Sequence, residues 1–548
     1  MANVLGINAV FHDPSAALVV DGRVMAAAEE ERFSRRKHGK RPLPFSAWEL
    51  PEKAIAWCLE SQGIDAGQLD AVAYSYDPAR LPRPTGDPTT DNWEELRTLY
   101  AERLPHFLRT TFGTDTPVPV TYVPHHEAHA ASAYFAAGYP DCAVLVVDGR
   151  GETTSSLTGW VSGGELKALS SSPLPHSLGL LYEELTEHLG FLRSSDEYKV
   201  MALASYGEPT HLEHMRRLVR FDDDGGFTTE LPAWRELSPP VGDGPGFDPR
   251  AADLARSVQN RLEEVLLEAA HWLAETTGES RLALAGGVAL NCVANTRLYI
   301  EGPFDEIWVQ PAAGDAGTSL GAAYLAAQRL GDEILPMETA ALGRSWSEDQ
   351  IQSILDDTGV PYDRPSDIAD AAAAILADDG VVGWFQGPGE FGPRALGHRS
   401  FLAHPGFEEN VERMNHVKGR ERFRPIAPIV TVERAGEIFA DGPIPSPYML
   451  FTHTVTAEWR ARIPAIVHVD GTARIQTVDR DAEPLLHQVL TGFESRTGLP
   501  VLINTSFNTA GRPMVDHPAE ALECMASSPI DAVALGPFLV RRTNLLGR

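Results

Sequence analysis

Short apolar segments separated by glycine-containing turns recur along the N-terminal half of the chain. The predicted strands lie at 4–8, 15–20 and 23–26, and again at 144–148, 155–161 and 165–169. Asp21-Gly22 and Gly163-Gly164 supply the tight turn between the second and third strand of each set. Recurrence of one strand–loop–strand–turn–strand unit after about 140 residues predicts two similar halves.

Two such halves, each an α/β layer, are typical of the actin, sugar-kinase and heat-shock ATPase superfamily, whose sheets are ribonuclease H-like. Predicted helices at 48–62 and 252–276 would pack on the two sheets. The regular pattern lapses between 331 and 346, which predicts a boundary between a first domain at 1–340 and a second α/β domain at 347–548. The second domain opens with an Ala-rich helix at 367–378 and a strand at 380–387.

Length and charge narrow the class of protein. The 548 residues exceed what one hydrophobic core organises. With 76 acidic and 46 basic residues the net charge is -30, which disfavours nucleic acid or an anionic membrane as the main partner. Four cysteines, none close to another in sequence, exclude a zinc ribbon or a CxxC site. No secretory signal or long apolar run occurs, so we expect a cytoplasmic protein with no membrane partner.

A histidine cluster opens the helix predicted at 125–135. His125 and His129 are four residues apart and share one face, whereas His126 points away. Two imidazoles at this spacing commonly bind one metal ion. Core or surface histidines that cluster by chance are the alternative.

Two aspartates extend the candidate metal site. Asp148 follows a buried apolar strand, and Asp315 lies where a loop enters an Ala-rich helix. Two histidines and two aspartates from three segments would make a mixed nitrogen and oxygen site, suited to Fe(II), Mn or Zn. A helix cap or a turn is the alternative role for either aspartate.

Other candidate binding residues lie at loops and strand ends. The Gly286-Gly287 turn can lie flat against a nucleotide, although tight packing explains it equally well. Arg394, Lys418, Arg424 and Arg474 are concentrated in the acidic chain's second domain, where their side chains suit phosphate. Arg420 and Arg422 have the alternative interpretation of solvated surface cations. The strand at 501–508 ends in amide and hydroxyl groups, which include Asn504 and Ser506.

Ten motifs in one order resemble, nearly end to end, the NodU/CmcH family of ATP-dependent O-carbamoyltransferases. They are FHDPSAAL (11–18), AEEERFSRRKH (28–38), HHEAHAASAY (125–134), VVDGRGE (146–152), EYKVMALASYG (197–207), AGGVALN (285–291), GDAGTSLGAA (314–323), GPRALGHRS (392–400), RFRPIAP (422–428) and NTSFN (504–508). The resemblance implies an actin-like N-terminal domain similar to the enzyme that transfers threonylcarbamoyl groups to tRNA. It also implies a YrdC-like C-terminal domain, the kind that forms the adenylate.

The resemblance implies two half-reactions. Carbamoyl phosphate is broken down to carbamate, which attacks the α-phosphate of ATP, used with Mg, to give carbamoyladenylate and pyrophosphate. An alcohol of a small molecule then takes the carbamoyl group and AMP leaves. Family members carbamoylate aminoglycosides, cephems, macrocycles, aminocoumarin sugars and nodulation signals, so the expected setting is the biosynthesis of an antibiotic or similar metabolite.

Site residues follow from the same resemblance, position by position. It implies His12 as the catalytic base, a role suited to imidazole near neutral pH. The implied ligands of Fe(II), with Mn or Zn as alternatives, are His125, His129, Asp148 and Asp315. The implied nucleotide-binding residues of the first domain are Gly286, Gly287 and Asn291. The implied carbamoyl phosphate and adenylate ligands of the second domain are Arg394, Lys418, Arg424, Arg474, Asn504 and Ser506.

Several alternatives stay open at this point. An actin-like kinase or ATPase would release ADP, and a fused tRNA-modifying pair would need a polyanionic substrate that the net charge disfavours. A nucleotide- or metal-gated binding protein would not need His12. The acceptor, the role of Lys199 and the choice between monomer and homodimer are undecided. We expect the irregular regions 77–115 and 220–249 to shape the acceptor pocket.

Overall fold

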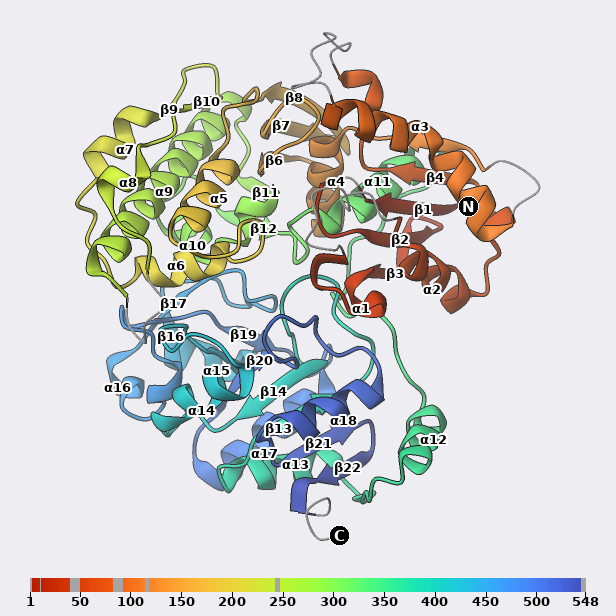
Figure 1. Ribbon diagram of the computed structural model, residues 1–548, viewed down its shortest axis with the longest axis vertical. Helices are drawn as coiled ribbons and strands as arrows, with labels where there is room; N and C mark the ends of the chain where they lie inside the picture. The colour runs from red at the N-terminus through yellow and green to blue at the C-terminus, as the bar shows by residue number, and fades with distance from the viewer. Residues whose placement is uncertain are drawn as a thin grey trace. The chain divides into compact units, whose positions relative to one another are not determined.

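The computed structural model describes residues 2–9, 11–39, 50–81, 92–113, 118–241 and 247–543. Their contacts divide the chain into two units (Figure 1). The N-terminal unit comprises Met1–Glu197, Pro209–Pro240 and Ser257–Leu342, and the C-terminal unit comprises Tyr198–Glu208, Val241–Arg256 and Gly343–Arg548. Two short segments from the first half of the chain therefore belong with the C-terminal unit. Among the described helices, none is long and apolar enough to cross a membrane.

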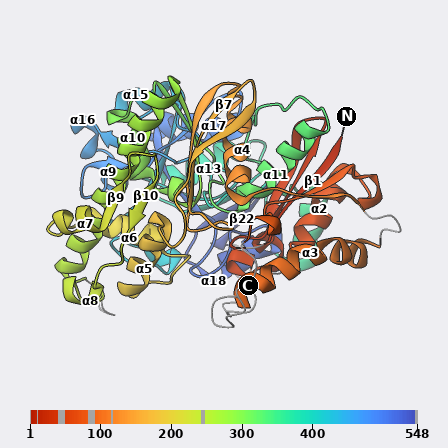
Figure 2. The same ribbon diagram turned by 90° about the horizontal axis from the view of Figure 1, so that it is seen from above.

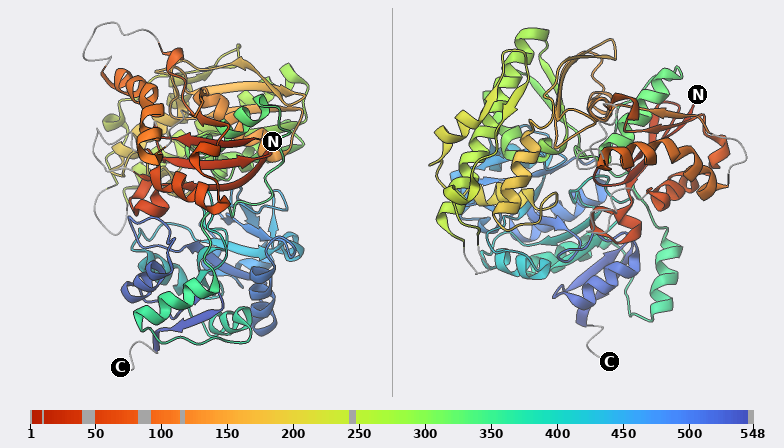
Figure 3. Two further views of the ribbon diagram at one scale, coloured as in Figure 1. Left: turned by 90° about the vertical axis from the view of Figure 1, so that its right-hand side faces the viewer. Right: turned by 45° about the horizontal axis from the view of Figure 1, so that its top comes forward.

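Two five-stranded sheets form the N-terminal unit. The first contains β1 (Asn3–Asn8), β2 (Ser15–Val20), β3 (Arg23–Glu29), β4 (Ala71–Tyr74) and β5 (Val120–Tyr122). The second contains β6 (Cys142–Val147), β7 (Ser156–Ser162), β8 (Glu165–Ser170), β11 (Arg281–Ala285) and β12 (Glu306–Val309). Their orders are β3-β2-β1-β4-β5 and β8-β7-β6-β11-β12. The left panel of Figure 3 shows the red strands of the first sheet side by side.

The two sheets have the same topology. In the first, β1 pairs antiparallel with β2 and parallel with β4, and in the second β6 pairs antiparallel with β7 and parallel with β11. The outer pairs also agree, antiparallel for the hairpin strand and parallel for the last strand. This duplication confirms the predicted actin-like, ribonuclease H-like fold, including the turn at Asp21-Gly22.

Two central helices separate the sheets. Helix α11 (Ala316–Arg329) packs on β1, β2 and β4, helix α4 (His125–Ala137) packs on β6 and β11, and the two helices pack on each other. Figure 2 shows these layers as β7, α4, α11, β1 and α2 (Glu52–Gln62). Alanine is the commonest residue of both helices and α11 also contains glycine, so their backbones can approach closely. Gly321 of α11 contacts the backbone of α4, and Gly6 of β1 contacts that of α11.

Further helices of the N-terminal unit are α3 (Asn92–Phe112), α5 (Leu178–His188), α7 (Leu212–Leu218) and α10 (Cys292–Glu301). Helix α9 (Pro249–Thr277) belongs to this unit from Ser257 onward, and α6 (Glu197–Ala204) belongs to the C-terminal unit from Tyr198 onward. The expected helix at 252–276 is confirmed as α9, and that at 48–62 is α2, with 48 and 49 outside the described residues. The expectation that 77–115 is irregular is wrong, because α3 occupies most of it. Residues 82–91, 114–117 and 242–246 of the expected acceptor loops lie outside the described residues.

The C-terminal unit is built on a seven-stranded mixed sheet of order β19-β15-β20-β14-β13-β21-β22. Its strands are β13 (Val382–Phe385), β14 (Arg399–Ala403), β15 (Ala427–Thr431), β19 (Gln476–Val478), β20 (Val501–Ser506), β21 (Ala532–Leu535) and β22 (Phe538–Arg541). The helices of this unit include α13 (Ile368–Ala377), α14 (Glu409–Lys418), α17 (Pro484–Thr497) and α18 (Pro518–Ser527). One apolar core includes Trp384, Phe401 and Phe507. The expected α/β class of the second domain is confirmed, and its likeness to YrdC stays a prediction.

Because α4 and α11 pack closely, we expect any side chain at Gly321 to destabilise the protein strongly. A Cβ there would lie 1.8 Å from the carbonyl oxygen of Ala128 and 2.7 Å from the amide nitrogen of Ser132, and neither backbone atom can rotate away. We expect Gly321→Ala to lower the free energy of unfolding by about 3 kcal/mol, the upper end of the usual cost of overpacking. Chemical denaturation followed by circular dichroism measures it.

Gly67→Ala is the matched control, because nothing lies within 4 Å of a Cβ at Gly67. Its stability should stay within about 0.5 kcal/mol of the wild type. Equal stability of both variants would contradict the close approach of the two central helices.

Candidate metal and anion sites

Four side chains from three segments converge in the N-terminal unit. His125 begins α4, His129 lies one turn further, Asp148 follows β6 and Asp315 directly precedes α11. One ligand atom from each lies within 4.8 Å of all the others. The Nε2 atom of His125 is 3.6 Å from Asp148 Oδ2 and 3.6 Å from Asp315 Oδ1, and that of His129 is 3.8 and 3.6 Å from the same atoms. The structure thus brings together the four residues selected as metal ligands.

The cluster is buried and its imidazoles lack hydrogen bonds on the side that faces the aspartates. Both histidines are 0% exposed, and neither Nε2 atom makes a hydrogen bond. Burial of such polar atoms without partners is costly. The Nδ1 atom of His125 lies 3.1 Å from the carbonyl oxygen of Ser75, so Nδ1 carries the hydrogen and Nε2 presents its lone pair to the cluster.

Each of the two aspartates likewise presents a carboxylate oxygen to the histidines. The backbone N–H of Gly287 donates to Asp148 Oδ1 at 2.8 Å, which leaves Oδ2 toward the histidines. Asp315 occupies the N-cap position of α11 but its side chain makes no cap hydrogen bond, so the alternative of a helix cap fails for this residue. Burial alone would raise the pKa of Asp315, but His125 and His129 lower it well below its usual range.

The pKa of His125 shifts in the opposite sense. Burial would lower it, but Asp315 and Asp148 raise it well above its usual value. Without a cation, the buried carboxylates therefore favour the protonated form of His125. Two neutral imidazoles and two carboxylates form a donor set that fits Fe(II), Mn or Zn.

Sequence reasoning missed two residues that support this cluster. Glu152 is buried, and its Oε1 accepts the backbone N–H of His125 at 2.9 Å and that of Asp77 at 2.8 Å. Ser75 supplies the carbonyl group described above, and its hydroxyl lies 2.8 Å from that of Thr318. Glu152 ends the VVDGRGE motif and could have been singled out there, whereas a role played by the Ser75 backbone leaves no trace in sequence.

His126 points away from the cluster, as its position on the helix predicts. Its Nδ1 lies 2.9 Å from the hydroxyl of Thr154. Burial and the neighbouring His125 lower the pKa of His126 to about 3, so it is neutral at physiological pH.

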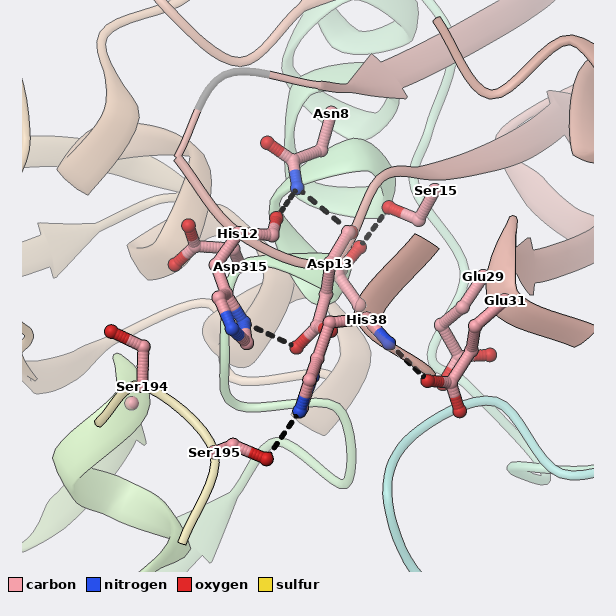
Figure 4. A network of polar contacts seen from close by, with 12 residues as sticks. Asn8, His12, Asp13, Ser15, Glu29, Glu31, His38, Ser194, Ser195 and Asp315 are labelled. Atoms are coloured by element: carbon pink, nitrogen blue, oxygen red, sulfur yellow. Dashed lines mark hydrogen bonds and ion pairs between the residues drawn. The ribbon is translucent and has the colours of Figure 1, made fainter. Parts of the chain in front are cut away.

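His12 lies in the loop between β1 and β2. Its side chain is 30% exposed, and its Nδ1 is 2.9 Å from Asp13 Oδ2. Asn8 fixes the loop by donating to the carbonyl oxygens of His12 at 2.7 Å and Asp13 at 3.0 Å (Figure 4). The Ser75 hydroxyl donates to Asn8 Oδ1 at 3.2 Å. Buried hydrogen bonds therefore connect the His12 loop with the residue that orients His125.

Two of the three predicted nucleotide-binding residues, Gly286 and Gly287, lie beside Val147 and Asp148 at the end of β6. Gly286 has a φ of 91°, and a Cβ there would lie 2.2 Å from the carbonyl oxygen of Val147, so only glycine fits. Gly287 donates to Asp148, as described above. The side chain of Asn291 caps α10 and exchanges hydrogen bonds with Gln259 at 2.9 and 3.1 Å. Nucleotide binding by these residues stays a prediction, and the structure gives each a local structural role.

In the C-terminal unit, Lys418 ends α14 and points at the end of β20. Lys418 is buried, and its Nζ donates to the hydroxyl of Ser506 at 2.8 Å, to the Ser506 carbonyl oxygen and to Asn508 Oδ1. Asn504, two residues earlier, donates to the oxygens of Ala395 and Gln476 at 3.2 and 2.7 Å. The structure thus places Lys418 at the end of β20, the strand that contains Asn504 and Ser506. Arg394 is half-buried in the loop before β14.

Three arginines share a second cluster in this unit. The pKa of Arg420 is lowered to about 9 by burial and by the charges of Arg424 and Arg474. Its Nη2 atom is buried without a hydrogen bond. The interpretation of Arg420 as a solvated surface cation is therefore wrong, whereas Arg422 is 72% exposed and agrees with it. Exposure depends on the tertiary fold, which the local sequence of the two residues does not reveal.

Lys199 acquires a structural partner in the same unit. Its Nζ lies 2.7 Å from Glu421 Oε1, and the other oxygen of Glu421 lies 3.7 Å from Arg424. The guanidinium of Arg424 also lies 4.4 Å from the ring centre of Tyr198. Tyr198 and Lys199 therefore help to hold Arg424, which explains why this segment belongs with the C-terminal unit.

Family models match most of the chain. The model named Carbamoyltransferase N-terminus matches residues 3–81, 95–235 and 242–324, and that named Carbamoyltransferase C-terminus matches residues 373–542. The chain belongs to the carbamoyltransferase family. Membership of this family identifies carbamoyl transfer as the class of reaction. It also confirms the family suggested by the sequence motifs.

Two relatives are similar to this carbamoyltransferase over most of their length. It is 38% identical to nodulation protein NolNO of Sinorhizobium fredii over 98% of this chain and 80% of the relative. It is 37% identical to an uncharacterized protein of Synechocystis sp. over 99% of this chain and 97% of the relative. A solved structure of T.kodakarensis HypF overlaps 60% of this chain and 48% of its own, with 16% identity and a TM-score of 0.34.

The arginine cluster of the carbamoyltransferase predicts a conflict between stability and anion binding. We expect Arg420→Met to stabilise the ligand-free protein by about 1–2 kcal/mol, because it removes a half-buried charge without a full set of partners. Thermal unfolding with and without inorganic phosphate measures both effects. Phosphate should raise the melting temperature of the wild type more than that of the variant.

Arg422→Met is the matched control, since Arg422 is mainly exposed. It should change neither stability nor the effect of phosphate. A destabilised Arg420→Met, or an unchanged phosphate effect in it, would contradict the electrostatic description of the cluster.

Proposed function

We propose that this carbamoyltransferase uses ATP and carbamoyl phosphate to form carbamoyladenylate, and then transfers the carbamoyl group to a hydroxyl of a small-molecule natural product. The observation that supports this most strongly is the buried cluster of His125, His129, Asp148 and Asp315. In a member of a carbamoyl-transferring family, this cluster would place a divalent metal on the same hydrogen-bonded scaffold as His12.

The C-terminal unit would carry out the first half-reaction. Water converts carbamoyl phosphate to carbamate and inorganic phosphate, and a carbamate oxygen then attacks the α-phosphorus of ATP. The bond from that phosphorus to the bridging oxygen of the β-phosphate breaks, and pyrophosphate leaves with its electron pair. Arg394, Lys418, Arg424 and Arg474, with Asn504 and Ser506, would bind the phosphates and the adenylate. Preorganised cations of this kind stabilise the negative charge that grows in such a transition state, and the buried position of Lys418 strengthens its contribution. Arg420 belongs with this group on account of its place in the arginine cluster.

The N-terminal unit would carry out the second half-reaction. A bound Fe(II), Mn or Zn ion, held by His125, His129, Asp148 and Asp315, would supply a Lewis acid. His12 accepts the proton of the acceptor hydroxyl as the oxygen attacks the carbamoyl carbon. The bond from that carbon to the AMP oxygen breaks, and AMP leaves with the electron pair. Gly286 and Gly287 would allow the nucleotide to approach closely.

Product analysis tests this function. We expect incubation with ATP, Mg, carbamoyl phosphate and Fe(II) to give AMP and pyrophosphate. A panel of hydroxylated aminoglycosides, cephems, macrocycles, aminocoumarin glycosides and lipooligosaccharides should include a compound that gains the mass of one carbamoyl group. His12→Asn should retain adenylate formation and lose about 10²–10⁴-fold in the rate of transfer, the usual contribution of a general base.

Release of ADP would instead identify a small-molecule kinase or ATPase, and absence of nucleotide cleavage would rule out both enzymes. If His12→Asn lowered the rates of both half-reactions equally, the assignment of adenylate formation and carbamoyl transfer to different units would be contradicted.

Metal binding has a separate readout in the thermal stability of the protein. We expect Mn(II) or Zn(II) to raise the melting temperature of the metal-stripped wild type, because an ion at about 1,000 times its dissociation constant adds about 4 kcal/mol. The double variant His129→Ala/Asp315→Ala should show no such rise. Asp141→Asn is a suitable control, because Asp141 is an exposed aspartate near the start of β6. An equal rise in all three proteins would place the metal elsewhere.

A further inference from the structure

The side chains of His12, Asp13, His38 and Ser195 form a continuous chain of contacts beside the β1–β2 loop (Figure 4). Asp13 bridges the two imidazoles, with Oδ2 at 2.9 Å from Nδ1 of His12 and Oδ1 at 2.9 Å from Nδ1 of His38. The Nε2 atom of His38 lies 2.8 Å from the hydroxyl of Ser195. The bridging carboxylate thus uses both of its oxygens on ring nitrogens.

The hydrogens follow from the chemistry of the bridge. An ionised carboxylate only accepts hydrogen bonds, so Nδ1 of each histidine must carry a hydrogen. In the neutral form of each imidazole, His38 Nε2 then accepts the hydrogen of the Ser195 hydroxyl at 2.8 Å, and His12 Nε2 bears a lone pair. Burial alone would raise the pKa of Asp13, but His12 and His38 lower it well below its usual range, so the carboxylate stays ionised.

The network is fixed by its surroundings rather than by its own contacts alone. Asn8 donates to the backbone oxygens of His12 and Asp13, and the backbone N–H of His38 donates to Glu31 Oε2 at 2.7 Å. Asp13 and His38 both adopt left-handed backbone conformations, with φ of 43° and 61°. Non-glycine residues in this region carry strain that surrounding contacts must maintain, and such residues concentrate at functional sites.

By residue type, His12, Asp13 and His38 could also hold a metal ion. The geometry favours hydrogen bonding, because each oxygen of Asp13 is already at hydrogen-bond distance from a ring nitrogen. A metal between them would have to displace both hydrogens. The four-residue cluster differs in this respect, since its Nε2 atoms have no hydrogen-bond partner.

We propose that Asp13, held in place by His38 and Ser195, is a positioning residue that fixes the tautomer and orientation of His12. This rests on the proposed function, in which Nε2 of His12 accepts the hydroxyl proton of the acceptor. The O–H bond breaks, the oxygen bonds to the carbamoyl carbon, and AMP leaves with its electron pair. Asp13 stays ionised and stabilises the imidazolium that forms. His38 limits the movement of Asp13 by occupying its second oxygen.

Three substitutions to asparagine at left-handed positions test this role with matched backbone strain. Asparagine tolerates that conformation, and its amide is nearly isosteric with aspartate. We expect Asp13→Asn to lower kcat for transfer to the best panel acceptor by about 10²–10⁴-fold with little change in KM, because an amide favours the wrong tautomer of His12. His38→Asn, whose amide can still donate to Asp13, should lose less than about tenfold. Asp21→Asn, at the exposed hairpin turn with φ of 52°, should match the wild type.

A double-mutant cycle separates positioning from general structural damage. In the His12→Asn background, Asp13→Asn should cause no further loss of transfer, because its effect acts through His12. Adenylate formation should stay unchanged in all these variants. Additive losses in the double variant, or a parallel loss of adenylate formation, would overturn the assignment.

Nitrogen-15 NMR of histidine-labelled protein gives a readout that does not depend on turnover. The His12 signals should show the hydrogen on Nδ1 in the wild type and on Nε2 in Asp13→Asn. An Nε2-protonated tautomer in the wild type would refute the proposal. Wild-type protein that has the expected tautomer but transfers no carbamoyl group would refute the proposed function. The catalytic role of Asp13 would then fail, whereas its role in fixing the tautomer of His12 would stand.

Discussion

The packing of α4 against α11 is the constraint on which the N-terminal unit depends. Gly321 lets the two backbones approach, and Gly6 does the same between β1 and α11. Because the two helices begin at the same end of the layers, His125 and Asp315 face each other across a few ångströms. Asp148 reaches the same point from the end of β6, held by the backbone of Gly287. The site therefore results from helix packing and sheet topology together.

Charge is distributed differently in the two units, and each distribution calls for a different ligand. The buried cluster in the N-terminal unit combines two carboxylates with two imidazoles, and the Nε2 atoms of these imidazoles are left without hydrogen bonds. The C-terminal unit gathers Arg420, Arg424 and Arg474 closely enough to depress the pKa of Arg420. A cation relieves the first arrangement and an anion the second. A metal-assisted transfer and a phosphate-dependent activation, the two parts of the proposed reaction, require this pair of environments.

Much of the fold could be predicted from local patterns. Asp21-Gly22 and Gly163-Gly164 specify hairpin turns whatever surrounds them, so the duplicated strands were visible in the sequence. The spacing of His125 and His129 likewise determines that they share a helix face. Tertiary contacts decided the rest. Arg420 and Arg422 are similar in sequence terms, yet only Arg420 is drawn into the arginine cluster. The bridge from Asp13 to His38 joins two motifs whose meeting depends on the path of the chain between them.

The central claim is that four side chains from three segments hold one metal ion in the N-terminal unit. Anomalous X-ray scattering from crystals of protein loaded with Fe(II) or Zn(II), measured at the absorption edge of the metal, tests it most directly. The account predicts one dominant anomalous peak at coordination distance, about 2.0–2.2 Å, from Nε2 of His125 and His129 and from carboxylate oxygens of Asp148 and Asp315. A dominant peak between His12 and His38, or no peak at the four-residue cluster, would contradict it.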